Sequence, residues 1–106
     1  MREAPMGALD EAQIQQALAQ LNAYCSQPWS LSEGALCRRF TFESFSQAFA
    51  FMSNLAGYAE EVDHHPDWRN CYRQVDIRLT SFDVKGISER DFDFAMESER
   101  VARELR

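Results

Sequence analysis

The chain is poor in several residue types that define whole classes of protein. It has only three cysteines, Cys25, Cys37 and Cys71, and no C-x-x-C spacing, so neither a disulfide framework nor a cysteine-based zinc site is expected. No stretch reaches the ~18 apolar residues of a membrane span, and residues 1–7 have no apolar segment typical of a secretory signal. These absences predict a cytoplasmic protein with reduced thiols and no membrane association.

Positive charge is also scarce. Eleven Lys and Arg residues stand against seventeen Asp and Glu residues, which gives a formal net charge of -6. Contacts to phosphates need clustered basic side chains, and the clusters here are limited to Arg38-Arg39 and an interspersed C-terminal tail. Direct binding of nucleic acid is therefore not expected.

The length and composition fit one compact domain. With 106 residues, 45% of them hydrophobic, the chain can bury a single core and has no room for a second. Residues 1–8 are small, polar or Pro/Gly-bearing and show no periodicity. We expect a flexible N-terminal lead over residues 1–8 and a single domain over residues 9–106.

Three segments have the capping residues and the periodicity of helices. Asp10, followed three residues later by a glutamine, forms a potential capping box for a helix over about residues 11–23. Residues 44–62 give the strongest helical pattern. Ser88 and Asp91 form a second potential capping box, which predicts a final helix after a turn.

The helix expected over residues 44–62 has an apolar stripe broader than one contact face needs. Two interpretations remain open: a deeply packed core helix, or a helix that also packs against another subunit. Phe51 and Tyr58 lie at the edge of the stripe and widen it. The residues of the stripe are Phe45, Ala48, Phe49, Met52, Leu55, Ala56, Ala59 and Val62.

The remaining segments alternate in polarity as strands do. A hairpin is expected around residue 33, because a turn at Glu33-Gly34 separates a short segment at residues 29–31 from an alternating segment that includes Phe40. Residues 70–82 are expected to form one long strand. An antiparallel sheet with helices on one side is the economical packing for such an order. The core face of the long strand is expected to carry Cys71, Val75, Ile77 and Leu79.

The segment from Glu60 to Trp68 contains both histidines of the chain, four carboxylates and an indole. Histidine titrates near neutral pH, so His64 and His65 concentrate the proton-transfer capacity of the chain at one place. Pro66 is expected to end the preceding helix. The pair could instead cap the helix C-terminus, where imidazolium is favoured. No metal site is expected, because adjacent histidines rarely point at one ion.

Several motifs together resemble the signature of the pterin-4a-carbinolamine dehydratase family. The resemblance covers about residues 10–103 and implies an α+β fold: an antiparallel four-stranded sheet with three helices packed on one face, in the order α-β-β-α-β-β-α. It also implies a homodimer or homotetramer. The motifs are Glu60-x-x-Asp63-His64-His65-Pro66-x-Trp68, Tyr72, Thr80-Ser81-Phe82-Asp83, Ser88-Glu89-Arg90-Asp91 and, upstream, Trp29 and Phe40-x-Phe42-x-x-Phe45-x-x-Ala48-x-x-Phe51-Met52.

The resemblance implies a lyase that acts in tetrahydrobiopterin recycling. Its substrate would be 4a-hydroxytetrahydrobiopterin, its product quinonoid dihydropterin, and its chemistry general acid/base catalysis by histidine without a metal or organic cofactor. The expected catalytic residues are His64, His65 and Glu60; Glu60 lies four residues before His64, so on a continuing helix it would share a face with that ring and fix its tautomer.

Five further residues are expected to contact the pterin. Trp68 could stack on the pterin ring or fill space in the hydrophobic core, and the sequence favours neither interpretation over the other. Asp91 could contact the substrate as well as cap its helix, and Arg90 could contact the substrate or be solvated. The full set of expected substrate-binding residues is Asp63, Trp68, Phe82, Arg90 and Asp91.

Phe82 departs from the family pattern. The family usually has a third active-site histidine at this position, and a phenyl ring can neither give nor accept a proton. Losing one proton-transfer partner typically costs about two to four orders of magnitude in rate. The alternative interpretation is therefore a noncatalytic dimeric scaffold, assembly factor or transcriptional-coactivator-like protein on the same fold.

Overall fold

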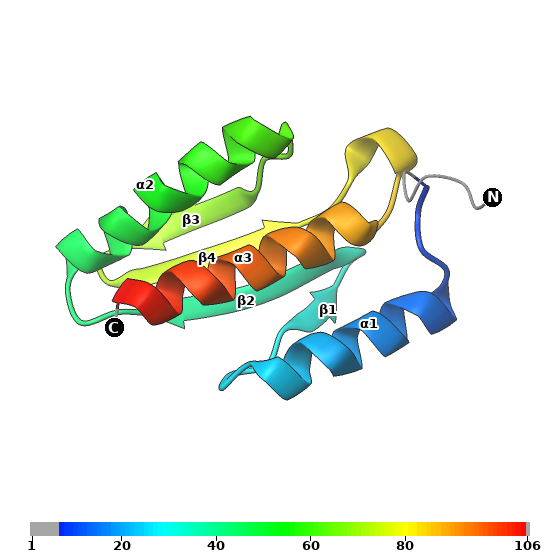
Figure 1. Ribbon diagram of the computed structural model, residues 1–106, viewed down its shortest axis with the longest axis horizontal. Helices are drawn as coiled ribbons and strands as arrows, with labels where there is room; N and C mark the ends of the chain where they lie inside the picture. Colours follow the sequence, from blue (N-terminus) through cyan, green and yellow to red (C-terminus); the bar gives the residue numbers. More distant parts are fainter. Residues whose placement is uncertain (1–6, 106) are drawn as a thin grey trace.

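A computed structural model describes residues 7–105 of the chain. The four strands form one antiparallel sheet in the order β1-β2-β4-β3, and the three helices cover one of its faces (Figure 1). This is the α+β architecture that the sequence predicted. The elements in chain order are α1 (Glu11–Tyr24), β1 (Ser30–Ser32), β2 (Ala35–Thr41), α2 (Phe45–Val62), β3 (Asp67–Cys71), β4 (Gln74–Leu79), the 3-10 turn η1 (Phe82–Val84) and α3 (Glu89–Leu105).

Two expectations about the chain as a whole remain predictions. The flexible lead over residues 1–8 falls mostly outside the described residues, and the extent of a single domain over residues 9–106 is not tested. Within residues 7–105, none of the helices has the length and apolarity needed to cross a bilayer.

Aromatic side chains fill the layer between the sheet and the helices. Trp29, Phe40, Phe51 and Phe94 are all at most 1% exposed. The Phe40 ring lies 4.8 Å from the Phe51 ring and 5.9 Å from the Trp29 ring, measured between centroids. Burying a side chain of this size stabilises a fold by about 1.5–3 kcal/mol, so these rings hold α2 and α3 against β2.

Local capping chemistry sets the start of α1 as expected. The Asp10 carboxylate accepts the Gln13 backbone N–H at 2.8 Å, and the Gln13 side chain accepts the Asp10 backbone N–H at 2.8 Å. This reciprocal pair satisfies two backbone donors that the first turn of a helix leaves without partners. The expected hairpin is also present, with β1 and β2 joined through Glu33 and Gly34 in left-handed conformations.

The buried face of α2 agrees only in part with the expected stripe, of which Ala48, Leu55 and Ala59 are buried. Phe51, which was placed at the edge of the apolar stripe, is completely buried, whereas Phe45 and Phe49 are 49% and 56% exposed. The helix is apolar on two sides, so periodicity alone could not identify which side faces the sheet. The buried residues of α2 are Ala48, Phe51, Leu55 and Ala59.

The prediction of a single long strand over residues 70–82 is wrong. The segment contains the end of β3, a two-residue turn at Tyr72 and Arg73, then β4 and η1. Tyr72 has a left-handed φ of 55°, and Cys71 pairs with Gln74 across the turn. The turn shifts the alternation by one residue, so Cys71 is exposed on the face of the sheet opposite the core.

Candidate active site

The C-terminal end of α2, the turn η1 and the first turn of α3 surround a cleft of about 550 Å³. Both histidines contribute to its wall. This volume lies within the range that small-molecule sites occupy. The residues that line the cleft are Asp63, His64, His65, Pro66, Asp67, Thr80, Phe82, Asp83 and Arg90.

The way in which α2 ends separates the two histidines. The helix stops at Val62, before Pro66 could act, because Asp63 adopts a left-handed conformation with φ 53° and ψ 46°. The backbone N–H of His64 then reaches back to the Ala59 carbonyl at 3.1 Å, a common way of closing a helix C-terminus. As a result, the His64 side chain is 9% exposed and the His65 side chain is 53% exposed.

A buried carboxylate holds the ring of His64. Nε2 of His64 lies 2.6 Å from Oδ1 of Asp91, whose side chain is 0% exposed. The other carboxylate oxygen of Asp91 accepts the Ser81 hydroxyl and the Ser88 backbone N–H, both at 2.9 Å. Asp91 therefore has all its contacts inside the protein, and it joins the start of α3 to the end of α2.

His65 has a different carboxylate partner on the solvent side. Its Nε2 lies 3.0 Å from Oε2 of Glu60, and the Glu60 side chain is 80% exposed. Glu60 was expected to share a helix face with His64. That geometry is absent because the helix ends at Val62 and the chain turns at Asp63, which leaves His65 within reach of Glu60 instead.

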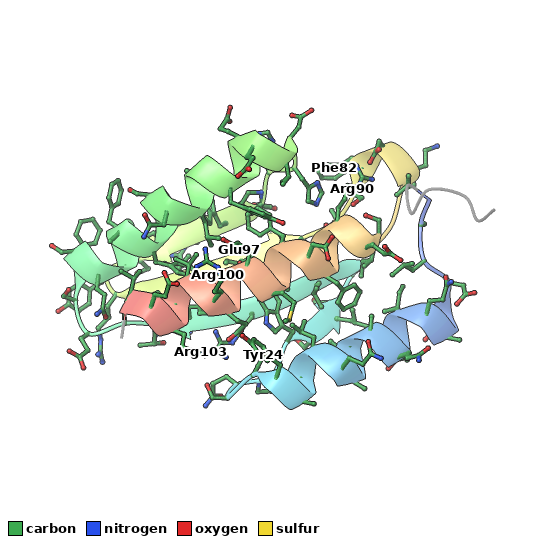
Figure 2. All side chains as sticks on the ribbon, viewed as in Figure 1. Tyr24, Phe82, Arg90, Glu97, Arg100 and Arg103 are labelled. Carbon is green, nitrogen blue, oxygen red and sulfur yellow. The ribbon has the colours of Figure 1, made fainter. Side chains whose placement is uncertain are left out.

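An aromatic ring and an ion pair form the rim of the cleft. Phe82 is 83% exposed, and Figure 2 shows it beside Arg90 where η1 leads into α3. Nη2 of Arg90 donates to Oδ1 of Asp83 at 2.8 Å. This hydrogen bond is the main reason why the pKa of Asp83 lies below its usual value and the pKa of Arg90 lies above its usual value. The rim therefore keeps its charges across the neutral range.

The structure brings most of the sequence-predicted site residues together. Asp63, His64, His65, Phe82 and Arg90 line the cleft, while Glu60 and Asp91 support the two imidazoles from outside the lining. Trp68 lies on β3 opposite Ile77, where its half-buried ring packs against the hydrophobic core.

Sequence reasoning missed three supporting residues. Ser81 and Ser88 share a hydrogen bond of 2.8 Å beside Asp91, and Asp83 pairs with Arg90. Ser81 and Asp83 flank Phe82 within a motif already singled out, but their partners became identifiable only once the turn η1 was placed. Among residues 7–105, no group of three potential metal ligands lies close enough to hold an ion.

Comparison with known proteins agrees with the fold and the motifs. The family model described as pterin 4 alpha carbinolamine dehydratase matches residues 7–101. A Rhodopseudomonas palustris protein, provisionally named as a pterin-4-alpha-carbinolamine dehydratase, is 44% identical over 73% of this chain and 78% of its own length. The Drosophila melanogaster pterin-4-alpha-carbinolamine dehydratase is 42% identical to this chain. The matched segment covers 74% of this chain and 42% of the Drosophila protein.

Two solved structures resemble this one. A transcriptional coactivator/pterin dehydratase from Brucella melitensis has a TM-score of 0.83 at 36% identity, over 91% of this chain and 99% of its own. A pterin dehydratase-like protein identified as a RuBisCO assembly factor of the alpha-carboxysome has a TM-score of 0.60 at 28% identity, over 74% of this chain and 92% of its own.

Proposed function

This chain belongs to the pterin-4a-carbinolamine dehydratase family, and we propose on that premise that it removes water from a 4a-hydroxytetrahydropterin. The reaction breaks the N5–H bond and the bond between C4a and the hydroxyl oxygen, and it forms a double bond between N5 and C4a. A base takes the N5 proton and an acid protonates the departing hydroxyl, so the products are quinonoid dihydropterin and water. Both groups must lie within hydrogen-bond reach of the substrate.

His64 is the base in this proposal. Asp91 already accepts hydrogen bonds from Ser81 and Ser88, so it acts as a carboxylate acceptor and favours the proton of His64 on Nε2. Nδ1 is then the ring nitrogen that can accept the N5 proton. The 2.6 Å contact between His64 and Asp91 at the wall of a ligand-sized cleft is the observation that most supports this function.

His65 is the acid in this proposal. The Glu60 carboxylate, 3.0 Å from its Nε2, orients the ring at the wall of the cleft, where it can pass a proton to the departing hydroxyl. Asp91 cannot act directly on the pterin, because its carboxylate is completely buried behind His64. We therefore assign Asp91 a positioning role rather than the substrate contact expected from the sequence.

The rim residues bind the substrate in this proposal. Phe82 offers an exposed ring that can stack on a flat pteridine, an arrangement aromatic rings favour. Arg90 and Asp63 line the same cleft and can donate to and accept from the polar edge of the ring system. Trp68 lies outside that lining, so a stacking role for Trp68 would need the substrate to extend beyond the cleft.

Direct assay of carbinolamine dehydration tests this function. We expect the wild-type protein to accelerate the reaction above the buffer rate, and His64→Ala to reduce that acceleration by about two to four orders of magnitude. Arg100→Gln is the matched control, because Arg100 lies on α3, where it pairs with Glu97 and Glu104. A His64→Ala protein that is folded and as active as the control would contradict the proposal.

A noncatalytic role is the second candidate, and Phe82 is the feature that favours it. The family's usual third histidine is replaced by a ring that cannot transfer protons. One structural relative with this fold is identified as a RuBisCO assembly factor. In this alternative, the chain is a scaffold whose cleft no longer turns over a pterin, and the wild-type protein would show no acceleration in the same assay.

We also propose that the chain forms a homodimer or homotetramer. Phe45 and Phe49 lie on the outer side of α2 with ring centroids 6.0 Å apart, and each is about half exposed. Two adjacent exposed phenylalanines are typical of a surface that another subunit covers. This supports the second of the two interpretations of the broad apolar stripe.

A further inference from the structure

The face of the sheet away from the helices carries a second cleft, of about 500 Å³. It lies over two rows of side chains that the strand register brings together across the sheet. Arg39, Asp76 and Arg69 form one row, on β2, β4 and β3 respectively. The neighbouring row, which starts on β1, consists of Ser30, Cys37, Arg78 and Asp67.

The net charge of this cleft is opposite in sign to the net charge of the whole chain. Four arginines line the cleft, but the Arg38 side chain is buried beside Glu99. The other three guanidinium groups face two carboxylates, whereas the chain carries a formal charge of -6. Arg39 uses Nε and Nη2 to hold both oxygens of Asp76, at 2.7 and 3.2 Å. Because that carboxylate is already paired, the cleft is a poor site for a cation and keeps a net positive charge.

Arg69 is the guanidinium with the most capacity left for a ligand. Its side chain is 70% exposed, and the ion pair that it makes with Asp76 is 4.0 Å long. The Arg39–Asp76 pair does not use Nη1 of Arg39. Arg78 is fixed instead, because its terminal nitrogens donate to the carbonyls of Ser32 and Glu33, both at 3.0 Å. Two arginines across one row can therefore offer donors to the same oxyanion.

The chemistry of the lining favours a small ligand over a protein. Trp68 and Ile77 belong to the lining, but both pack against the hydrophobic core, and the large hydrophobic residues exposed within residues 7–105 lie elsewhere. Protein interfaces usually need accessible apolar or aromatic anchors at their centre. A volume of about 500 Å³ is typical of small-molecule sites. We propose that this second cleft, here called the arginine cleft, binds a small oxyanion, a phosphate or carboxylate group, through Arg39 and Arg69.

Nuclear magnetic resonance of the arginine Nε–Hε groups in the full chain tests this proposal directly. Inorganic phosphate and succinate are titrated separately in buffer of constant ionic strength, so that the two arms distinguish a phosphate ligand from a carboxylate ligand. We expect at least one of them to shift the Arg39 and Arg69 signals saturably. The Arg100 signal is the internal control, since Arg100 is 51% exposed and ion-paired on the other side of the molecule.

The variant Arg69→Gln provides the second readout. It removes an exposed side chain that makes one long ion pair, so its thermal unfolding should match that of the wild type, while its affinity for the anion falls about tenfold. Arg100→Gln should leave the affinity unchanged. The proposal is overturned if neither anion gives saturable shifts, if Arg100 shifts in parallel with Arg39, or if Arg69→Gln binds like the wild type. None of these outcomes depends on dehydratase turnover.

Discussion

At the scale of single residues, burial assigns different tasks to groups that look alike in the sequence. His64 and His65 are adjacent and chemically identical, yet one is buried against Asp91 and the other is exposed beside Glu60. The motif resemblance identified most of the residues that line this cleft, although they come from segments as far apart as Asp63 and Arg90. The pairing of His64 with Asp91 was not, because the two are 27 residues apart and their contact depends on where α3 begins.

Asp91→Asn tests the positioning role. The variant keeps the size of the side chain but removes the charge that favours the Nε2 proton of His64, so turnover should fall by about two orders of magnitude. Stability should fall by about 1–3 kcal/mol, because buried hydrogen bonds to Ser81 and Ser88 are weakened. Asp93→Asn, an exposed position two residues further along α3, is the control for both measurements. Wild-type pH–rate behaviour in Asp91→Asn would contradict the role.

Cys25 gives a prediction that depends on pH. Burial and, less strongly, the charge of Glu99 raise its pKa from 9.0 to about 11, and the thiolate is the reactive form. At pH 8 the thiolate fraction should therefore be about 100-fold below that of an unperturbed thiol, and alkylation should accelerate as pH rises toward 11. Mass spectrometry after iodoacetamide treatment should find the exposed Cys71 labelled first; equal labelling at pH 8 would be inconsistent with this environment.

At the scale of elements, the sequence predicted structure well wherever a local interaction decides it. The capping box at Asp10 and the hairpin turn at Glu33-Gly34 are set by neighbouring residues, and both are present. The β3–β4 turn was missed because Tyr72 is not a typical residue for a left-handed turn position. The buried face of α2 was predicted only in part, because the helix is apolar on two sides and only packing against the sheet selects Phe51 rather than Phe45 and Phe49 for burial.

Phe49→Ser tests the proposed interface on α2. Phe49 is 56% exposed within one chain, so the variant should leave the stability of the isolated fold nearly unchanged. A Phe buried between subunits contributes about 1.5–3 kcal/mol, so the dissociation constant of the oligomer should rise at least about tenfold. Analytical ultracentrifugation over a range of concentrations measures this. Met96→Ser, which removes an exposed apolar residue on α3, is the control, and equal weakening by both would argue against α2.

At the scale of the whole molecule, the fold carries two separate clefts for which we propose ligands. The cleft with the histidines lies where the helices meet the strand ends, and the arginine cleft lies on the face without helices. Asp67 contributes to the lining of both clefts. The net charge of -6 predicted that the chain does not bind nucleic acid directly. It gave no indication of a locally positive cleft, because that cleft depends on the register of three strands.

The most direct test of the central claim is the rate of carbinolamine dehydration by Phe82→His beside the wild-type protein. If the cleft is a dehydratase site that lacks one proton-transfer group, the wild type should exceed the buffer rate, and the new histidine should raise turnover by about two orders of magnitude without changing thermal stability, since Phe82 is 83% exposed. A wild-type rate equal to buffer, with no gain in Phe82→His, would contradict the account.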